Sequence, residues 1–422
     1  MCVAEAREPA RISSVGRHDP VSSVFVGVDI GKRKHQSALL GEKGEVLAKT
    51  LSFPNSLIGF ESFLKQMAPW TKEDILIGLE ATGHYWIDLY THLTDSGYSV
   101  VVINPLQTDG VRNMYMRKTK NDRADALIIA DVLRFGRFRE SSVPEENIAQ
   151  LQSLSRMRTG MVLSIGSLKR SVITVLDRLF PEFESCFKDV FSKSSMTVLD
   201  EYADPEDLSN CPLEKLTNVL WNGSNGRLGV VKAELLKKTA SRSFGTAYAK
   251  DAMKFQLKLL LDQARFIQSQ VDEIEKKIKE LMKEHQLITT IPGISDILGA
   301  AILGEIGEVS RFESPKQVVA FAGLDPSVHQ SGSFNATSMR ISKRGSPHLR
   351  RALYIAAHVA RIHDPVLKEY YEKLMGKGKH HRQAQTAVAA KLARIVYSVL
   401  FLNEPYDQEK LKLKPKLDHL TA

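Results

Sequence analysis

The sequence predicts an α/β domain, a pair of long helices and a mostly helical C-terminal domain, in that order along the chain. Three observations support this fold class. Apolar runs typical of strands alternate with helical patterns across residues 24–140. A hydrophobic repeat typical of paired helices runs through residues 144–180 and returns in residues 246–286. Residues 287–403 consist mainly of helical patterns.

The first half of the α/β domain is predicted to contain three strands and a helix. VFVGVDIG is a strand-like apolar run that ends in glycine. HQSALLG and EVLAKTLSF are separated by the turn residues of GEKGE, so we expect them to form a hairpin. Asn55 is the expected cap of a helix that continues through Leu64.

The second half of this domain alternates strands with helices. DILIGLE is the next strand, and HYWIDLYTHLTDSG is a helical pattern that stops at Gly97. YSVVVINP is a further strand, which Pro105 ends, and KNDRADALIIADVLR is the last helix. The expected order within residues 24–140 is therefore βββαβαβα.

Residues 144–286 are predicted to form a coiled-coil arm with an insert. In the second helix, apolar residues alternate four and three apart and charges fill the outer positions. These residues are Met253, Leu257, Leu260, Ala264, Ile267, Val271, Ile274, Ile278 and Leu281. The first helix, which Pro181 ends, repeats likewise at Met161, Ile165, Leu168, Val172, Val175 and Leu179.

We expect the two helices to form an antiparallel arm or to pair with another subunit. A plain bundle inside one chain is the alternative. Residues 182–245 are expected to form a small helical insert.

The C-terminal domain, residues 287–403, opens with LITTIPGISDILGAAILGEIG. IPGI followed by a helix rich in Gly and Ala is similar to a helix-hairpin-helix motif, in which backbone N–H groups contact phosphate without reading sequence. An ordinary hairpin between packed helices is the alternative. HQSGSFNATS is expected to be a loop, and Ser346 followed by Pro347 is a typical helix start.

The positive charge of the chain is concentrated near its C-terminus. The formal net charge is +9, and residues 331–394 alone contain thirteen Lys or Arg against three Asp or Glu. A concentrated basic segment indicates a partner with a phosphate backbone. A solvated basic surface is the alternative.

Several protein classes are excluded by composition. The three cysteines are widely spaced and form no CxxC pair, which argues against a disulfide framework and a zinc site. No continuous apolar run approaches the ~18 residues of a membrane span. Residues 1–23 lack the apolar segment of a signal peptide and are expected to be a flexible extension, and residues 404–422 a flexible tail. These features predict a soluble, cytoplasmic protein with no membrane partner.

Four acidic residues are the candidate catalytic site. Asp29 and Glu80 each close an apolar run, whereas Asp122 and Asp125 lie three apart on a helix and therefore share one face. Two carboxylates on one face repel each other unless a cation or a basic partner lies between them. A solvated helix start, compensated by nearby Arg and Lys, is the alternative.

Taken together, the four acids indicate a metal site. Ends of adjacent strands in a parallel-type sheet line the same crevice. Hard carboxylate oxygens without His or Cys select Mg²⁺ or Mn²⁺. Two such ions about 3.5–4 Å apart activate a nucleophile and stabilise the leaving oxygen in phosphoryl transfer.

The strand–Asp, strand–Glu and helical DxxD pattern resembles the RuvC branch of the RNase H fold. The closer resemblance is to the DEDD transposases of insertion sequences, the family related to the Piv DNA invertase. The matching strings are VGVDIGKRKH, IGLEATGHYW, VVINPLQTDGVRNMYMRKTKNDRADALIIADVL, TTIPGISDILGAAILGEIG and FAGLDPSVHQSGSFNATSMRISKRGSPHLRRALY. This resemblance implies metal-binding, catalytic roles for Asp29, Glu80, Asp122 and Asp125.

The same resemblance implies a serine nucleophile in the C-terminal domain. The family's Ser-Gly pair matches Ser331 and Gly332, where the family often has a second Ser at the position of Gln330, and Ser333 is the competing candidate. Arg340, Lys343 and Arg344 follow closely and are expected to hold the nucleic-acid phosphate. The alternative for these cations is nonspecific backbone contact.

The resemblance further implies a structured guide RNA, the bridge RNA, that pairs with donor and target DNA. Acids from one subunit and the serine of another require a homo-oligomer, such as dimers that form a tetramer. The expected activity is therefore Mg²⁺-assisted DNA transposition by transesterification.

Three other functions remain open from the residues alone. The same acids would serve a junction-resolving or other nuclease that uses water, although the C-terminal domain with its serine argues against this. VGVDIGKRKH also resembles the first phosphate loop of actin-like ATPases and sugar kinases, although no later DxG-type loop or adenosine motif follows. A DNA-binding protein without catalysis is the third.

Overall fold

The structure, a computed structural model, consists of two compact units, Met1–Pro144 and Glu145–Ala422. It describes residues 22–80, 85–103, 108, 122–136, 138, 144–326, 330–331, 334–335 and 340–409.

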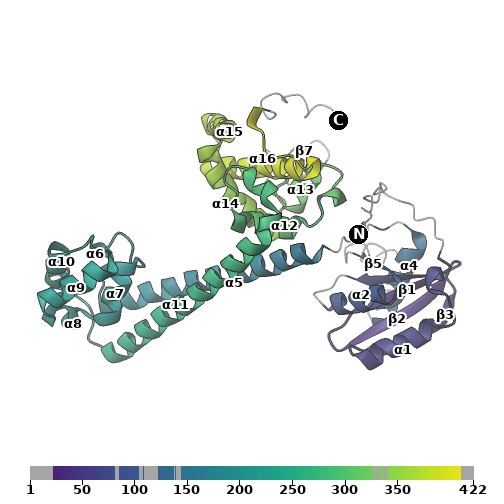
Figure 1. Cartoon of the computed structure of the whole chain (residues 1–422), viewed down its shortest axis with the longest axis horizontal. Coiled ribbons are helices and arrows are strands. Elements are labelled where there is room, and N and C mark those ends of the chain that lie inside the picture. The colour runs from purple at the N-terminus through teal and green to yellow at the C-terminus, as the bar shows by residue number, and fades with distance from the viewer. Residues whose placement is uncertain are drawn as a thin grey trace, which may run out of the picture. The chain divides into compact units, whose positions relative to one another are not determined.

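The N-terminal unit is built on one mixed five-stranded sheet (Figure 1). Its strands are β1 (Val24–Asp29), β2 (Lys34–Gly41), β3 (Val46–Pro54), β4 (Ile75–Glu80) and β5 (Ser99–Ile103). The strand order is β3-β2-β1-β4-β5. The pairs β1–β2 and β2–β3 are antiparallel, which confirms the predicted hairpin, whereas β1–β4 and β4–β5 are parallel.

Helices cover both faces of this sheet. They are α1 (Leu57–Met67), α2 (Trp86–Asp95) and α4 (Asp122–Phe135), and a short 3₁₀ turn η1 (Lys72–Asp74) precedes β4. The apolar residues of α1 and α2 pack on one face, and those of α4 pack on the other. Among the described residues of this unit, the elements follow the predicted order βββαβαβα.

The predicted cap of α1 is wrong by one residue. Ser56, not Asn55, is the N-cap, because its hydroxyl accepts a hydrogen bond from the Gly59 N–H at 3.3 Å. The helix runs on to Met67, since Phe63 and Met67 are both buried against the sheet. Asn55 instead uses its side-chain amide to bond the Lys32 carbonyl.

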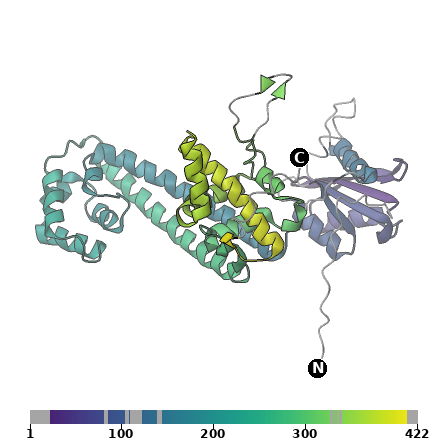
Figure 2. The ribbon, with the colours of Figure 1, turned by 90° about the horizontal axis from the view of Figure 1, so that it is seen from above.

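The second unit contains two long helices, α5 (Glu146–Leu179) and α11 (Lys250–Leu281), which lie side by side (Figure 2). They are antiparallel, because Arg158 pairs with Glu275 near one end while the Thr246 N–H bonds the Arg178 carbonyl at the other. Met253, Leu257, Val271, Ile274 and Ile278 of the predicted seam on α11 are buried, whereas its last residue, Leu281, is half-buried. The middle residues of the seam, Leu260, Ala264 and Ile267, are also only half-buried.

A helical insert joins these two helices. Its helices are α6 (Phe183–Cys186), α7 (Lys193–Glu201), α8 (Pro205–Asn210), α9 (Leu213–Gly223) and α10 (Val230–Ala240). They share one apolar core with the adjoining ends of α5 and α11, and Cys186 and Cys211 are free thiols in that core. The buried Asp204 carboxylate pairs with Lys254 at 2.7 Å, which ties the insert to α11.

The other end of the two long helices carries the C-terminal helices (Figure 1). These are α12 (Asp296–Ile306), α13 (Pro315–Phe321), α14 (Pro347–His363), α15 (Pro365–Gly376) and α16 (His381–Leu402), with 3₁₀ turns η2 (Met282–Glu284), η3 (Gln286–Thr290) and η4 (Val309–Arg311). Ser346 caps α14 and Pro347 is its first residue, as predicted. Gly304 allows α12 to lie against the α5 backbone, because a Cβ there would lie 2.6 Å from the Gln152 Cα.

Two helices meet a length-and-composition criterion for a membrane span. The best 18-residue windows of α5 and α16 have mean hydropathies of 1.2 and 1.3. The sequence prediction missed them because it required a continuous apolar run. Core helices of soluble proteins meet the same criterion, and half of the α16 window is buried inside the unit, so this is weak evidence for a membrane segment.

Candidate active site

Asp29 and Glu80 lie at the carboxyl ends of two neighbouring parallel strands. β1 pairs with β4 up to Val28 opposite Leu79, and each strand continues by one residue to its acid. Side chains alternate between the two faces of a strand. Both acids therefore belong to the face that α4 covers, because Phe25 packs with α4 residues and Gly27 and Gly78 lie directly beneath that helix.

Helix α4 runs antiparallel to β1 and brings its first turn toward these acids. The Ala126 carbonyl lies over Gly27, whereas Arg134, near the other end of α4, lies beside Gly44 in the β2–β3 turn. That turn is at the amino end of β1, since Gly41 pairs with Val24. The beginning of α4 is therefore at the carboxyl ends of β1 and β4.

The positions of Asp122 and Asp125 continue the sheet-facing stripe of α4. They lie one turn before Ala126 and Ile129, which are fully buried against the sheet. Four helical residues advance by ~6 Å, which matches the ~6.6 Å that two strand residues span from Gly27 to Asp29. Asp125 is only 9% exposed. The side chain of Asp122 lies outside the described residues.

A pair of glycines allows helix α4 to lie close to strands β1 and β4. Gly27 and Gly78 are opposite each other in the β1–β4 ladder, two residues before Asp29 and Glu80 respectively. A Cβ on Gly27 would lie 2.1 Å from the Ala126 carbonyl oxygen and 2.4 Å from the Ala130 nitrogen. Only a residue without a side chain fits there. The matching GxD and GxE strings were the sequence feature that could have predicted this contact.

Thr108 is a further site residue that the sequence did not single out. It is fully buried, and its hydroxyl donates a hydrogen bond to Glu80 Oε2 at 2.8 Å. Such a bond to a carboxylate fixes the direction in which its remaining lone pairs point. No local pattern marks Thr108, because it meets Glu80 across 28 residues of chain.

The residues present fit a hard divalent cation. The described donors at the strand ends are all carboxylates, which is the ligand type that Mg²⁺ and Mn²⁺ prefer. Among the described side chains, no group of three or more His, Cys, Asp or Glu is already close enough to hold a metal. The fourth acid, Asp122, is not among those side chains.

Two segments of the chain match known protein domains. Residues 26–181 match the IS110-type DEDD domain, described as a transposase, and residues 285–372 match a domain described as Transposase IS116/IS110/IS902 family. The chain belongs to the IS110 family of transposases. The expected family is thereby confirmed, and this IS110-family transposase is an enzyme that acts on DNA.

Curated relatives of the transposase match it over almost its whole length. A 44.8 kDa protein of insertion element IS116 from Streptomyces clavuligerus is 24% identical over 91% of this chain and 95% of its own. The mini-circle putative transposase for IS117 from Streptomyces coelicolor is 24% identical, over 92% and 96%. The pilin gene-inverting protein of Moraxella bovis is 22% identical, over 92% and 99%.

The predicted nucleophile of the transposase lies on a short hairpin. Ser331 ends β6 (Gln330–Ser331), which pairs with β7 (Phe334–Asn335), so that Ser331 is opposite Phe334. The sequence prediction of a plain loop is therefore wrong here. A two-residue Gly-Ser connection, as at positions 332 and 333 of the sequence, is typical of a β-hairpin. Ser333 and the side chain of Ser331 lie outside the described residues, so the choice between these serines stays a prediction.

The three predicted phosphate-binding cations lie on a fixed turn before α14. Arg340, Lys343 and Arg344 are exposed. Lys343 adopts a left-handed conformation with φ of 53° and donates its N–H to the Gly323 carbonyl at 3.1 Å. A bridge between Pro326 and Ile341 closes the segment that carries Ser331. The turn therefore holds its cations at the base of that segment.

A buried glutamate fixes the end of this turn. Glu305 on α12 accepts hydrogen bonds from Arg156 at 2.6 and 3.1 Å and from the Ser346 hydroxyl at 2.6 Å. Burial acts to raise the pKa of Glu305, but the hydrogen bonds from Arg156 and Ser346 outweigh it and hold the pKa below its ordinary value. The ionised carboxylate thus joins α5, α12 and the start of α14.

Replacing Thr108 with valine is expected to slow DNA recombination by about 10- to 100-fold, the usual effect of losing a hydrogen bond that orients a ligand. The change keeps the shape of the side chain and removes the hydroxyl that donates to Glu80. The half-saturating concentration of the divalent cation should rise, which a merely structural role would not cause.

Thr94→Val is the matched control, because the Thr94 hydroxyl bonds only carbonyls of its own helix. Equal rates and equal dependence on the divalent cation in the two variants would contradict a positioning role for Thr108.

Proposed function

We propose that this transposase exchanges DNA strands by transesterification, with Ser331 as nucleophile and with Mg²⁺ or Mn²⁺ held by Asp29, Glu80, Asp122 and Asp125. One observation carries this proposal. The first turn of α4 lies at the carboxyl ends of β1 and β4, so all four acidic positions converge at one end of these two strands.

Each step follows from groups that the chain supplies. A divalent ion at the acids, when bound, would offset the negative charge that develops on the scissile phosphate. The Ser331 hydroxyl loses its proton to water and attacks phosphorus, and the bond from phosphorus to one DNA oxygen breaks. The departing strand takes up a proton and leaves with a free hydroxyl.

The phosphoserine ester preserves a phosphodiester-like bond for the second step. A hydroxyl of the new strand partner attacks phosphorus, and the Ser331 oxygen leaves and regains its proton. Arg340, Lys343 and Arg344 are proposed to contact the DNA backbone, because they are exposed on the fixed turn at the base of the Ser331 segment.

The proposal also covers the partners of the transposase and its location in the cell. DNA is the substrate, and the family resemblance supports a structured guide RNA. The acids and Ser331 belong to different compact units, which suits a site completed by a second subunit in a dimer or tetramer. The two long helices are the proposed joint, because apolar side chains such as Phe255 and Phe266 remain exposed on α11. The transposase is proposed to work in the cytoplasm.

A suicide DNA substrate tests the nucleophile. Wild-type protein with Mg²⁺ should form a covalent adduct on DNA, and peptide mapping should find phosphoserine at position 331. Ser331→Ala should abolish the adduct, whereas Ser333→Ala should retain it. Cleavage by Ser331→Ala without any adduct would instead indicate a nuclease that uses water.

A further inference from the structure

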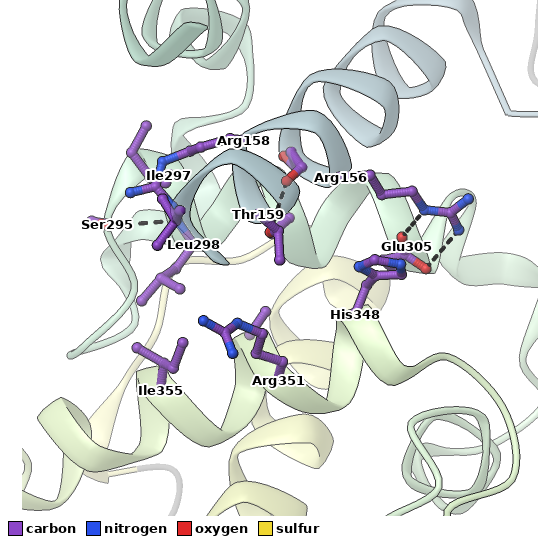
Figure 3. A pocket seen from close by; sticks show the side chains of 14 residues that line it. Arg156, Arg158, Thr159, Ser295, Ile297, Leu298, Glu305, His348, Arg351 and Ile355 are labelled. Carbon is purple, nitrogen blue, oxygen red and sulfur yellow. Dashed lines mark hydrogen bonds and ion pairs between the residues drawn. The ribbon is translucent and has the colours of Figure 1, made fainter. Parts of the chain in front are cut away.

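A cavity of about 400 Å³ in the C-terminal unit is not used by the chemistry proposed above (Figure 3). Three helices line it, namely α5, α12 and α14. They are far apart in sequence and meet through the apolar core of this unit. The wall from α12 belongs to the IPGISDIL segment, which is similar to a helix-hairpin-helix motif, whereas the walls from α5 and α14 join it only through tertiary packing.

The lining of this cavity is positively charged. Its lining contains three arginines, Arg156 and Arg158 on α5 and Arg351 on α14, and one acid, Glu305. Arg156 is neutralised by Glu305, and Arg158 pairs with Glu275 at 2.6 Å. Arg351 forms no ion pair within the described part of the chain, and Figure 3 shows its side chain reaching from α14 toward α5. One guanidinium is thus available to an anion.

A buried hydroxyl in the same cavity has no partner. Ser155 is 7% exposed, and among the described residues no group bonds its Oγ atom. Its backbone carbonyl is already used, since it accepts a hydrogen bond from the Thr159 hydroxyl at 2.8 Å. Leaving a buried hydroxyl unpaired costs free energy. A ligand with acceptor oxygens in the cavity would remove that cost.

The positive end of a helix also opens on this cavity. Ser295 caps α12 by accepting a hydrogen bond from the Leu298 N–H, and Ser295, Ile297 and Leu298 all line the cavity. Unpaired N–H groups and the helix dipole at such an end favour an anion. Asp296, the acid in this first turn, bonds the Gln286 side chain at 3.2 Å and does not line the cavity.

We propose that this cavity binds a backbone phosphate of a nucleic acid. The proposal rests on the function proposed above, since it takes DNA or RNA to be the partner. A guanidinium, a hydroxyl and a helix N-terminus together match the several acceptor oxygens of one phosphate. Ile297, Leu298 and Ile355 form an apolar wall beside them, which suits the adjoining sugar.

Binding measured without metal tests the cavity separately from the chemistry. The probes are a fluorescent 30-base-pair DNA duplex and a 30-nucleotide single-stranded RNA, each titrated with full-length protein in EDTA by anisotropy. Arg351→Gln should weaken binding of at least one probe by about 10-fold and should lower the slope of log affinity against log salt by about 0.9. Ser155→Ala should weaken it by about 5-fold without lowering Tm.

Arg170→Gln is the matched control, because it removes one exposed positive charge from α5 outside the cavity. It should change affinity less than 2-fold. Equal effects of Arg351→Gln and Arg170→Gln would overturn the proposal, since they would mean general electrostatics. Inorganic phosphate that raises Tm through Arg351, with nucleic-acid binding unchanged in Arg351→Gln, would also overturn it and indicate a small-anion site.

The probe that loses affinity identifies the strand that the cavity holds. Loss for the duplex assigns the phosphate to DNA, and loss for the single strand assigns it to RNA. If the cavity variants weaken binding but the wild-type protein forms no phosphoserine adduct, the proposed chemistry is refuted and the phosphate site in the cavity stands. If the wild-type protein forms the adduct but both cavity variants bind normally, the phosphate site is refuted and the proposed chemistry stands.

Discussion

Replacing Asp29 with asparagine is expected to reduce strand exchange by about 10³-fold or more while the N-terminal unit stays folded. The substitution keeps the size of the side chain and removes one negative charge from the place where the ends of β1 and β4 meet the start of α4. A metal ligand contributes several kcal/mol to charge stabilisation during phosphoryl transfer. Since each 1.36 kcal/mol changes a rate tenfold, the loss should reach about three orders of magnitude.

The measurement is the rate of recombination on a plasmid substrate at saturating Mg²⁺, with Tm recorded for the same preparation. Asp95→Asn is the matched control, because Asp95 is an exposed acid at the end of α2 in the same unit. It should recombine at the wild-type rate. Wild-type activity in Asp29→Asn would remove the metal-site proposal, whatever its Tm.

Alanine at Gly27 is expected to lower stability by about 2–3 kcal/mol and to lower activity further than the unfolded fraction explains. The new methyl group would meet the Ala126 carbonyl oxygen and the Ala130 nitrogen, both of which belong to the helix backbone. Backbone atoms do not rotate away, so α4 as a whole must shift from β1. Asp122 and Asp125 would then move away from Asp29 and Glu80.

Thermal unfolding checks the first part of this expectation, with a fall in Tm of roughly 5–10 °C for a unit of this size. Recombination at a temperature where the variant is folded checks the second part. Normal activity in folded Gly27→Ala would show that the spacing of α4 from the sheet does not matter for catalysis.

Two other glycines serve as graded controls for Gly27. Gly78→Ala meets mainly the side-chain ends of Leu133 and Ile129, which can rotate, so it should cost only about 1 kcal/mol. Gly160→Ala meets nothing within 4 Å in the middle of α5 and should stabilise that helix by about 0.5–1 kcal/mol. The order of the three variants therefore separates the steric contact from a general effect of alanine.

The sequence by itself predicted the order of the described elements and singled out the four candidate acids. Strand and helix periods are local, so VFVGVD and ILIGLE predicted β1 and β4, and the four-and-three spacing predicted α11. The cap of α1 was missed by one residue, because Asn55 and Ser56 are both good caps and tertiary contacts chose between them.

Only the tertiary structure decided how distant segments meet. Gly27 and Gly78 together make room for α4 because β1 and β4 are parallel and in register. Thr108 reaches Glu80 only once β5 has joined the same sheet. The cavity at Ser155 and Arg351 joins helices almost 200 residues apart. Such contacts depend on how whole elements pack, and no local period of the chain encodes that packing.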